Sequence, residues 1–178
     1  MSDTIAVMND GRIIQRNTPN NIYNCPNSIF VADFIGSGNF IPVSSVVEAN
    51  GGTVLKIMEE SDIFLKSNYG KSYKRMDTLP DFGYLNKGFV PPFFFIRPEK
   101  IKISGEESRV SRRDGTNLYR GTVKSIIFEG PDIKVGVQNP VLGNMKIEIK
   151  NDGSGCGFRE GQEIFFYWNP SDGLLLEC

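Results

Sequence analysis

The stretch that most constrains the fold of this chain runs from Phe93 to Ile103 and reads FFFIRPEKIKI. Its apolar run, Phe93 to Ile96, follows a proline pair and has the length of a fully buried strand. Pro98 lacks the N–H that a central strand donates, so the residues around it are expected to form a turn. Apolar and polar residues then alternate. The stretch therefore predicts a buried strand, a polar turn that holds Arg97 and Glu99, and a second strand with one face in water.

Composition favours short strands and turns over long helices. The chain has 13 Phe, 6 Tyr and 19 Gly in 178 residues, and we expect a mainly β fold. Its 20 basic and 21 acidic residues create no global field that would attract nucleic acid or an anionic membrane. The absence of histidine excludes His-based triads and His-ligated metals. Cys25, Cys156 and Cys178 lie far apart without a CxxC motif, which fits reduced thiols in the cytoplasm.

A hairpin is the first element that we expect. Thr4 to Met8 is an apolar-rich strand candidate, and Asn9-Asp10-Gly11 supplies residues that accept a positive φ. Arg12 to Gln15 should therefore return antiparallel to the first strand.

Two short helices are predicted after this hairpin. Thr18 and Pro19 suit the N-cap and the first position of a helix over Asn20 to Tyr23. Pro26 is expected to open a second helix that ends at Gly36 in the left-handed conformation. The apolar residues of this second helix fall on one face at spacings of three and four: Phe30, Val31, Phe34 and Ile35.

The same segment resembles the end of the nucleotide-binding domain of ABC importer ATPases. The matching positions run from Ser2 to Phe40 at fixed spacings and include Gly11, Gln15, Thr18-Pro19, Pro26, Phe34-Ile35-Gly36 and Asn39-Phe40. Thr4, Asn17 and Asn20-Asn21 depart from the family pattern. None of these four positions is a nucleotide contact in the family.

The motifs with which this family hydrolyses ATP are absent from the sequence. There is no GxxxxGK[ST] phosphate loop, signature motif, acidic strand end for magnesium or switch histidine. Gly36-Ser37-Gly38 and Gly153 to Gly157 are interpreted as turns. We therefore expect a C-terminal fragment that is not itself an enzyme and holds no cofactor or metal. The resemblance implies that the parent subunit would be an ABC transporter ATPase that uses ATP and Mg.

The remainder of the chain predicts a series of short strands. Two polar intervals, 68–92 and 105–116, are interpreted as irregular loops. Trp168 is expected in the core. The last five strand candidates suggest a small closed barrel, which would leave no exposed edge. The candidates are Phe40 to Val47, Thr53 to Ile57, Ile63 to Leu65, Tyr119 to Phe128, Ile133 to Gln138, Met145 to Lys150, Ile164 to Trp168 and Leu174 to Leu176.

This half resembles the TOBE domain, the C-terminal regulatory region of the same importer family. The resemblance implies an OB-fold-like β-barrel and divides the chain into a remnant of the nucleotide-binding domain, residues 1–36, and a regulatory domain, residues 37–178. The matching pieces are Ile96 to Ile101, Gly121-Thr122-Val123, Gly130 with Val135, Gly161 to Ile164 and Trp168-Asn169-Pro170.

Our first functional hypothesis is a regulatory and dimerisation region of an importer ATP-binding subunit. The resemblance implies a homodimer, a membrane permease and a second ATPase subunit as partners, and a place at the cytoplasmic face of the membrane. Arg97 and Glu99 are the candidate contact residues, and the alternative is that they pair with each other or cap nearby backbone. Because the sheet that they normally complete is missing, residues 1 to 36 are expected to be poorly anchored.

The second hypothesis is a barrel that senses a small oxyanion through Ser125, Gly130 and Lys134. A third, nucleic-acid binding, would require a basic groove lined with aromatics, and the barrel region has few of either. Basic clusters at Tyr69 to Arg75 and at Arg112-Arg113 are interpreted as solvated loops. Polyamine, ferric ion, sugar and inorganic anion importers share this layout, so the sequence leaves the transported substrate open.

Overall fold

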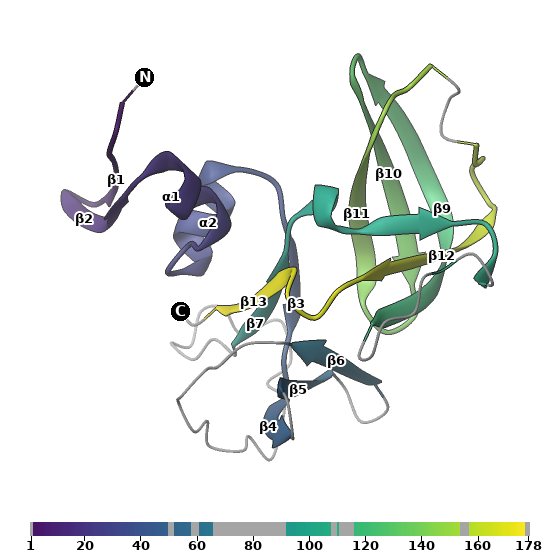
Figure 1. Cartoon of the computed structure of the whole chain (residues 1–178), viewed down its shortest axis with the longest axis horizontal. Helices are drawn as coiled ribbons and strands as arrows, with labels where there is room; N and C mark the ends of the chain where they lie inside the picture. Colours follow the sequence, from purple (N-terminus) through teal and green to yellow (C-terminus); the bar gives the residue numbers. More distant parts are fainter. Residues whose placement is uncertain are drawn as a thin grey trace.

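The computed structural model describes residues 2–49, 52–57, 61–65, 92–107, 110, 116–153 and 157–176. The chain is mainly β, with a hairpin and two short helices before the larger sheets (Figure 1). Most of the predicted loops at 68–92 and 105–116, including Tyr69 to Arg75 and Arg112-Arg113, lie outside the described residues. The strands are β1 (Ile5–Asn9), β2 (Arg12–Asn17), β3 (Asn39–Pro42), β4 (Ser45–Ala49), β5 (Gly52–Ile57), β6 (Ser61–Leu65), β7 (Phe93–Ile96), β8 (Lys102–Ser104), β9 (Asn117–Glu129), β10 (Asp132–Asn139), β11 (Gly143–Lys150), β12 (Glu163–Trp168) and β13 (Gly173–Leu176). The helices are α1 (Pro19–Asn24), α2 (Ile29–Ile35) and the 3₁₀ turn η2 (Pro98–Lys100).

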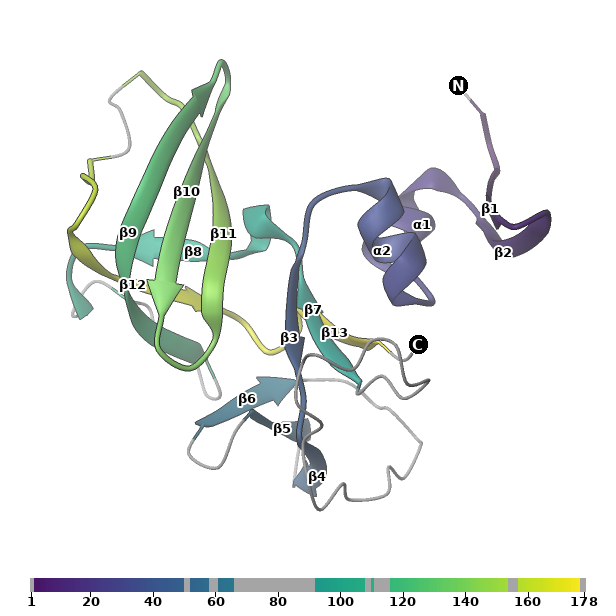
Figure 2. The same ribbon diagram turned by 180° about the vertical axis from the view of Figure 1, so that it is seen from behind.

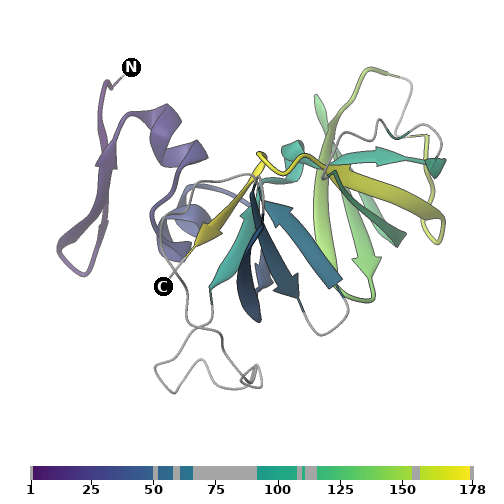
Figure 3. The same cartoon turned by 60° about the horizontal axis from the view of Figure 1, so that its bottom comes forward.

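All strand pairs of the described residues are antiparallel. The largest sheet has the order β11-β10-β9-β12-β8, and a second sheet has the order β13-β7-β3. A meander β4-β5-β6 and the hairpin β1-β2 complete the set. Seen from behind and from below, the five-stranded sheet lies at one end of the molecule and the hairpin at the other, with β3, β7 and β13 between them (Figures 2 and 3).

The five-stranded sheet curls into a half-barrel, and the OB-type fold expected from the sequence is confirmed in this form. An irregularity in the β9–β10 register sits where Gly136 pairs with Ser125 and Val137 with Val123, which leaves Lys124 as the extra residue of β9. Such a bulge bends a strand and increases its twist, so it helps the long strand β9 to curl.

The prediction that the last five strands form one closed barrel is wrong in two respects. The fifth strand of the sheet, beside β12, is β8 and not the segment Leu174 to Leu176. The sheet is also not closed, because no ladder joins β11 to β8 in the described part of the chain. β13 pairs with β7 instead. The reason is that Phe93 to Ile96 is buried, so its backbone groups need partners on both edges, and β3 and β13 supply them.

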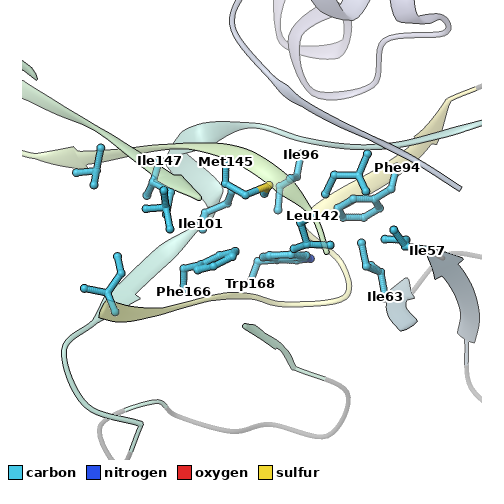
Figure 4. Close-up of a cluster of buried hydrophobic side chains, with 14 of the residues drawn as sticks. Ile57, Ile63, Phe94, Ile96, Ile101, Leu142, Met145, Ile147, Phe166 and Trp168 are labelled. Carbon is cyan, nitrogen blue, oxygen red and sulfur yellow. The ribbon is translucent and has the colours of Figure 1, made fainter. Parts of the chain in front are cut away.

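The main core lies between the half-barrel and the inner sheets. Side chains from β12 face those of β7 and β11, while Ile57 and Ile63 reach in from the meander (Figure 4). Trp168 is buried as predicted, and its ring stacks on Phe94 at 5.8 Å between centroids and on Tyr119 at 5.3 Å. The alternation of apolar and polar residues in β10 places Ile133, Val135 and Val137 in this core.

The hairpin is confirmed, with Asp10 at φ 47° and Gly11 at φ 75° in its turn. Thr18 caps α1 as predicted, because its Oγ1 accepts a hydrogen bond from the Asn21 N–H at 3.3 Å. Among the described residues, no helix is long and apolar enough to cross a membrane.

Three predictions for the second helix are wrong. α2 begins at Ile29 rather than near Pro26, because Ser28 is the N-cap and accepts from the Val31 N–H. Gly36 ends the helix with φ 168°, which is extended backbone and not the left-handed cap. The apolar face is divided, since Val31 is buried whereas Phe34 is 65% exposed.

Candidate functional site

Arg97 connects the helices to the β half of the chain. It follows β7 directly and is only 3% exposed. Nη1 donates to the carbonyl oxygens of Ala32, Gly36 and Ser37 at 3.2, 2.7 and 3.0 Å, and Nη2 donates to that of Tyr23 at 3.2 Å. The guanidinium therefore binds carbonyl groups at the C-terminal end of α2, which a helix leaves without internal partners and which carry its negative partial charge.

Tyr23 and Glu99 complete this junction. The guanidinium carbon of Arg97 lies 4.3 Å from the centre of the Tyr23 ring and 4.8 Å from that of Phe95. The Tyr23 hydroxyl donates to Glu99 Oε1 at 2.7 Å. Burial, followed by the hydrogen bond to Glu99, raises the pKa of Tyr23 to about 12, while burial lowers the pKa of Arg97. Glu99 is exposed.

These contacts contradict one expectation from the sequence and leave another as a prediction. The expectation that residues 1 to 36 are poorly anchored is wrong for the two helices, because Arg97 and Glu99 hold both of them. Arg97 does cap backbone, but that of a distant segment rather than of its own turn. The contact of Arg97 and Glu99 with a second subunit stays a prediction.

Sequence reasoning assigned no role to Asn39, a buried residue of β3. Its side-chain amide donates to the Lys146 carbonyl at 2.9 Å and to that of Ile96 at 3.3 Å, and its Oδ1 accepts from the Lys146 N–H at 2.7 Å. Asn39 thereby joins the inner sheet to the open edge strand β11. A polar residue at the start of the otherwise apolar run Phe40 to Pro42 was the available signal.

A groove of about 220 Å³ opens on the outer face of β9, β10 and β11, beside η2. Ser125 and Lys134, two residues proposed from the sequence, both line it. Gly130, the third, does not; it lies in the β9–β10 turn. Glu148 lines the groove as well, and Ser37 and Pro98 bring it next to the Arg97 junction.

Gly136 shapes the floor of this groove. It pairs with Ser125 on one side and with Lys146 on the other. A Cβ at this position would lie 2.5 Å from Ser125 Oγ, so only glycine leaves the Ser125 hydroxyl in its observed place. A weak signal for this role is present in the sequence, because Gly136 stands between the polar residues Lys134 and Gln138 on the same face of the predicted strand.

The family model of the TOBE domain matches residues 94–176. Residues 94–176 form a TOBE domain. The match begins within β7 and includes Arg97, the groove strands and β13.

Curated relatives extend the similarity beyond the TOBE domain to nearly the whole chain. The spermidine/putrescine import ATP-binding protein PotA of Trichodesmium erythraeum is 34% identical over 176 residues, which is 99% of this chain and 42% of that protein. The proteins of the same name from Treponema pallidum and Protochlamydia amoebophila are 31% and 29% identical, again over 99% of the chain and over 45% and 44% of their own lengths. The chain therefore spans less than half the length of these relatives. The resemblance to the C-terminal part of ABC importer ATP-binding subunits is confirmed.

A solved structure shares the fold. The cytoplasmic molybdate-binding protein ModG, in a form with molybdate bound, superposes with a TM-score of 0.55. The superposition covers 80% of this chain and 96% of that one at 10% identity. At this identity the likeness concerns the fold alone.

Proposed function

We propose that this chain is the regulatory region of the ATP-binding subunit of an ABC importer, and that its TOBE domain holds two such subunits together. The observation that carries the proposal is the Arg97 junction. Because Arg97 binds carbonyls of both helices from the first turn of the TOBE domain, a movement of either part is transmitted to the other. A pairing contact between TOBE domains would then keep the attached subunits at high effective concentration when they separate on ATP hydrolysis.

We propose the division at residues 36 and 37 as the boundary between the two parts. β3 pairs along its length with β7, and a Cβ at Gly38 would lie 2.2 Å from the Phe95 ring. Both observations support assigning the chain from Ser37 onward to the TOBE side. Residues 1–36 would then belong with the end of the nucleotide-binding domain.

The chemistry of the whole subunit is part of the same proposal. The relatives are named import ATP-binding proteins, and this chain has none of the phosphate-binding motifs described above. We assign ATP, Mg and hydrolysis to the parent subunit, which would work with a membrane permease at the cytoplasmic face. An ATPase assay of this chain should give no activity above buffer, and measurable turnover would contradict the assignment.

Exposed apolar side chains on the TOBE domain support pairing. Ile127 is 53% exposed and its neighbour Phe128 is 60% exposed, near the β9–β10 turn. As consecutive strand residues the two point to opposite faces of β9, and Phe128, the more exposed, is the side chain that we expect a pairing contact to bury.

Sedimentation over a wide concentration range tests pairing directly. We expect a dimer for the unchanged chain and a shift toward monomer for Phe128→Lys, because a charge would be buried in the contact. Ile13→Lys is the matched control, since Ile13 is also exposed but lies in the hairpin. A monomer at every concentration would contradict pairing through this chain alone.

The groove supports a second candidate function, the sensing of a small oxyanion. Ser125 and Lys134 meet in one groove as that hypothesis requires, although Gly130 lies outside it. Titration calorimetry with molybdate and sulfate tests the candidate. Saturable binding that Ser125→Ala weakens would support it, and no heat with either anion would contradict it.

A further inference from the structure

The groove contains polar side chains that have no direct hydrogen-bond or ion-pair partner among the described residues. Within the described residues, neither Lys146 nor Glu148 forms a side-chain hydrogen bond or an ion pair, and the hydroxyls of Ser37 and Ser125 form no hydrogen bond. Lys134, by contrast, pairs with Glu129 at 2.6 Å. Lys146, Glu148 and two hydroxyls therefore have no direct hydrogen-bond or ion-pair partner in the described part of the chain, although the Glu148 carboxylate also attracts the ammonium groups of Lys134 and Lys150.

These two charged side chains stand on the same face of one strand. Lys146 and Glu148 are two residues apart on β11, which places their backbones about 7 Å from each other. Lys146 is opposite Gly136, and Glu148 is opposite Lys134. Because Gly136 has no side chain, the Ser125 hydroxyl can lie over it, and Gly136 is the residue that separates Ser125 from Lys146 across the sheet.

The walls of the groove are apolar. Ile127, about half exposed, lines one side, and Pro98 lines another. At about 220 Å³ the groove is smaller than the roughly 300–1,000 Å³ typical of sites for drug-sized ligands, so it suits a small molecule.

We propose that this groove binds a small zwitterion with an apolar body, such as an aliphatic α-amino acid. Lys146 and the two serine hydroxyls would hold the carboxylate, Glu148 would hold the ammonium group, and Ile127 and Pro98 would cover the apolar body. A bare oxyanion fits less well, because it would approach the Glu148 carboxylate and leave the apolar walls unused. The inference rests on the groove of the second candidate function but assigns it a different class of ligand.

The position of the groove gives such a ligand a regulatory effect. Ser37 lines the groove, and its carbonyl oxygen accepts one of the Arg97 hydrogen bonds at 3.0 Å. A ligand that binds Ser37 and β11 together stabilises the attachment of α2 to the TOBE domain. By linkage, the attached state binds the ligand more tightly.

The test is a titration of the full chain followed by the backbone amide signals in NMR spectra. The probes are L-leucine, isovalerate, which lacks the ammonium group, 3-methylbutylamine, which lacks the carboxylate, and molybdate. We expect leucine to shift the amides of Ser37, Gly136 and Lys146. Each of the two singly charged probes should bind about tenfold more weakly, because each loses one charge-assisted contact.

Substitutions assign the two ends of the ligand. Lys146→Met should abolish the response to isovalerate and weaken leucine, whereas Glu148→Gln should do the same for 3-methylbutylamine and leucine. Lys102→Met, at an exposed lysine of β8, is the matched control and should leave both titrations unchanged.

Three outcomes would overturn the inference. Equal binding of leucine and isovalerate would exclude a role for Glu148. Binding of molybdate but not leucine would overturn the zwitterion and leave the oxyanion-sensing function standing. Absence of shifts with every probe would overturn the groove as a ligand site altogether, and the proposed pairing, measured by sedimentation, would be unaffected.

Discussion

The N-terminal part of the chain, with its hairpin and helices, and the remaining β part are stabilised by different interactions. The TOBE domain and the inner sheets share one large apolar core that includes Trp168, Phe166 and Phe94. The fully buried part of the N-terminal cluster contains only Val7, Ile22 and Val31. The hairpin projects from the rest of the molecule (Figure 1). The N-terminal part is therefore attached by the polar contacts of Arg97 together with a small apolar cluster, in which Ala32 of α2 packs with Phe95 and Leu176. The rest of the chain depends on its large apolar core.

The core of the TOBE domain should show the largest response to substitution. Trp168→Ala removes the ring at the centre of the aromatic stack and should lower the free energy of unfolding by about 3–5 kcal/mol. Urea unfolding followed by circular dichroism measures the change. Phe34→Ala, at the exposed ring of α2, is the control, and a loss of similar size there would contradict the contrast between the two halves.

Loss of the Arg97 junction should release the helices and spare the half-barrel. Arg97→Met keeps the aliphatic stem but leaves the bound carbonyls without a partner, which should cost about 3 kcal/mol locally. Hydrogen exchange should speed up at amides of residues 19–37 and change little in β9 to β12.

Arg97→Lys refines this test. Lysine keeps the charge but lacks the planar fork that reaches several carbonyls, so we expect protection of α2 between that of the unchanged chain and that of Arg97→Met. Equal protection in all three proteins would show that apolar contacts alone attach the helices.

Helix capping should have a smaller and strictly local effect. Thr18→Ala removes the hydroxyl that accepts from the Asn21 N–H and should weaken α1 by about 1 kcal/mol. Amide exchange in α1 measures it, with Thr122→Ala in β9 as the control. Faster exchange in β9 of the Thr18 variant would mean that the halves are more tightly coupled than the contacts suggest.

The smallest effect should appear only at high pH. Because the pKa of Tyr23 is raised to about 12, the folded state keeps a proton that the unfolded chain releases near pH 10. Stability should be intact below pH 10 and fall as the pH rises toward 12. Tyr23→Phe should lose less over this interval. Burial raises the pKa of Tyr119 in both proteins, so a comparison of their thermal melts isolates Tyr23.

Local patterns predicted most strands, because the alternation that forms Ile133 to Val137 or Met145 to Ile149 depends only on neighbouring residues. The partner of β13 could not be predicted, since the apolar pattern of Leu174 to Leu176 suits an edge of β12 as well as one of β7, and in the structure β8 takes the β12 edge. The start of α2 could have been predicted from Ser28, because a serine before an apolar run is an N-cap signal. Pro26 instead favours an earlier start, and this led to the wrong boundary.

The candidate site depends even more on contacts between residues that are distant in the sequence. Arg97 and Glu99 were selected from the sequence as residues of interest, but their partners Tyr23 and Ala32 lie far away in the chain. The groove depends on Ser37 meeting β11, which no local pattern encodes. Such contacts arise from topology, so a single sequence can indicate which residues matter without showing what they touch.

The central place of β7 between β3 and β13 also has a consequence for biosynthesis. Ribosomes make the chain from its N-terminus, so β3 and β7 emerge well before Gly173 to Leu176 can pair with them. Until then the nascent chain carries Phe93 to Ile96 with one unpaired apolar edge, which is the kind of surface that chaperones bind. β7, which Arg97 follows directly, gains its second partner only when β13, the last described segment, has been translated. We therefore expect the helices to become firmly attached late in the synthesis of the protein.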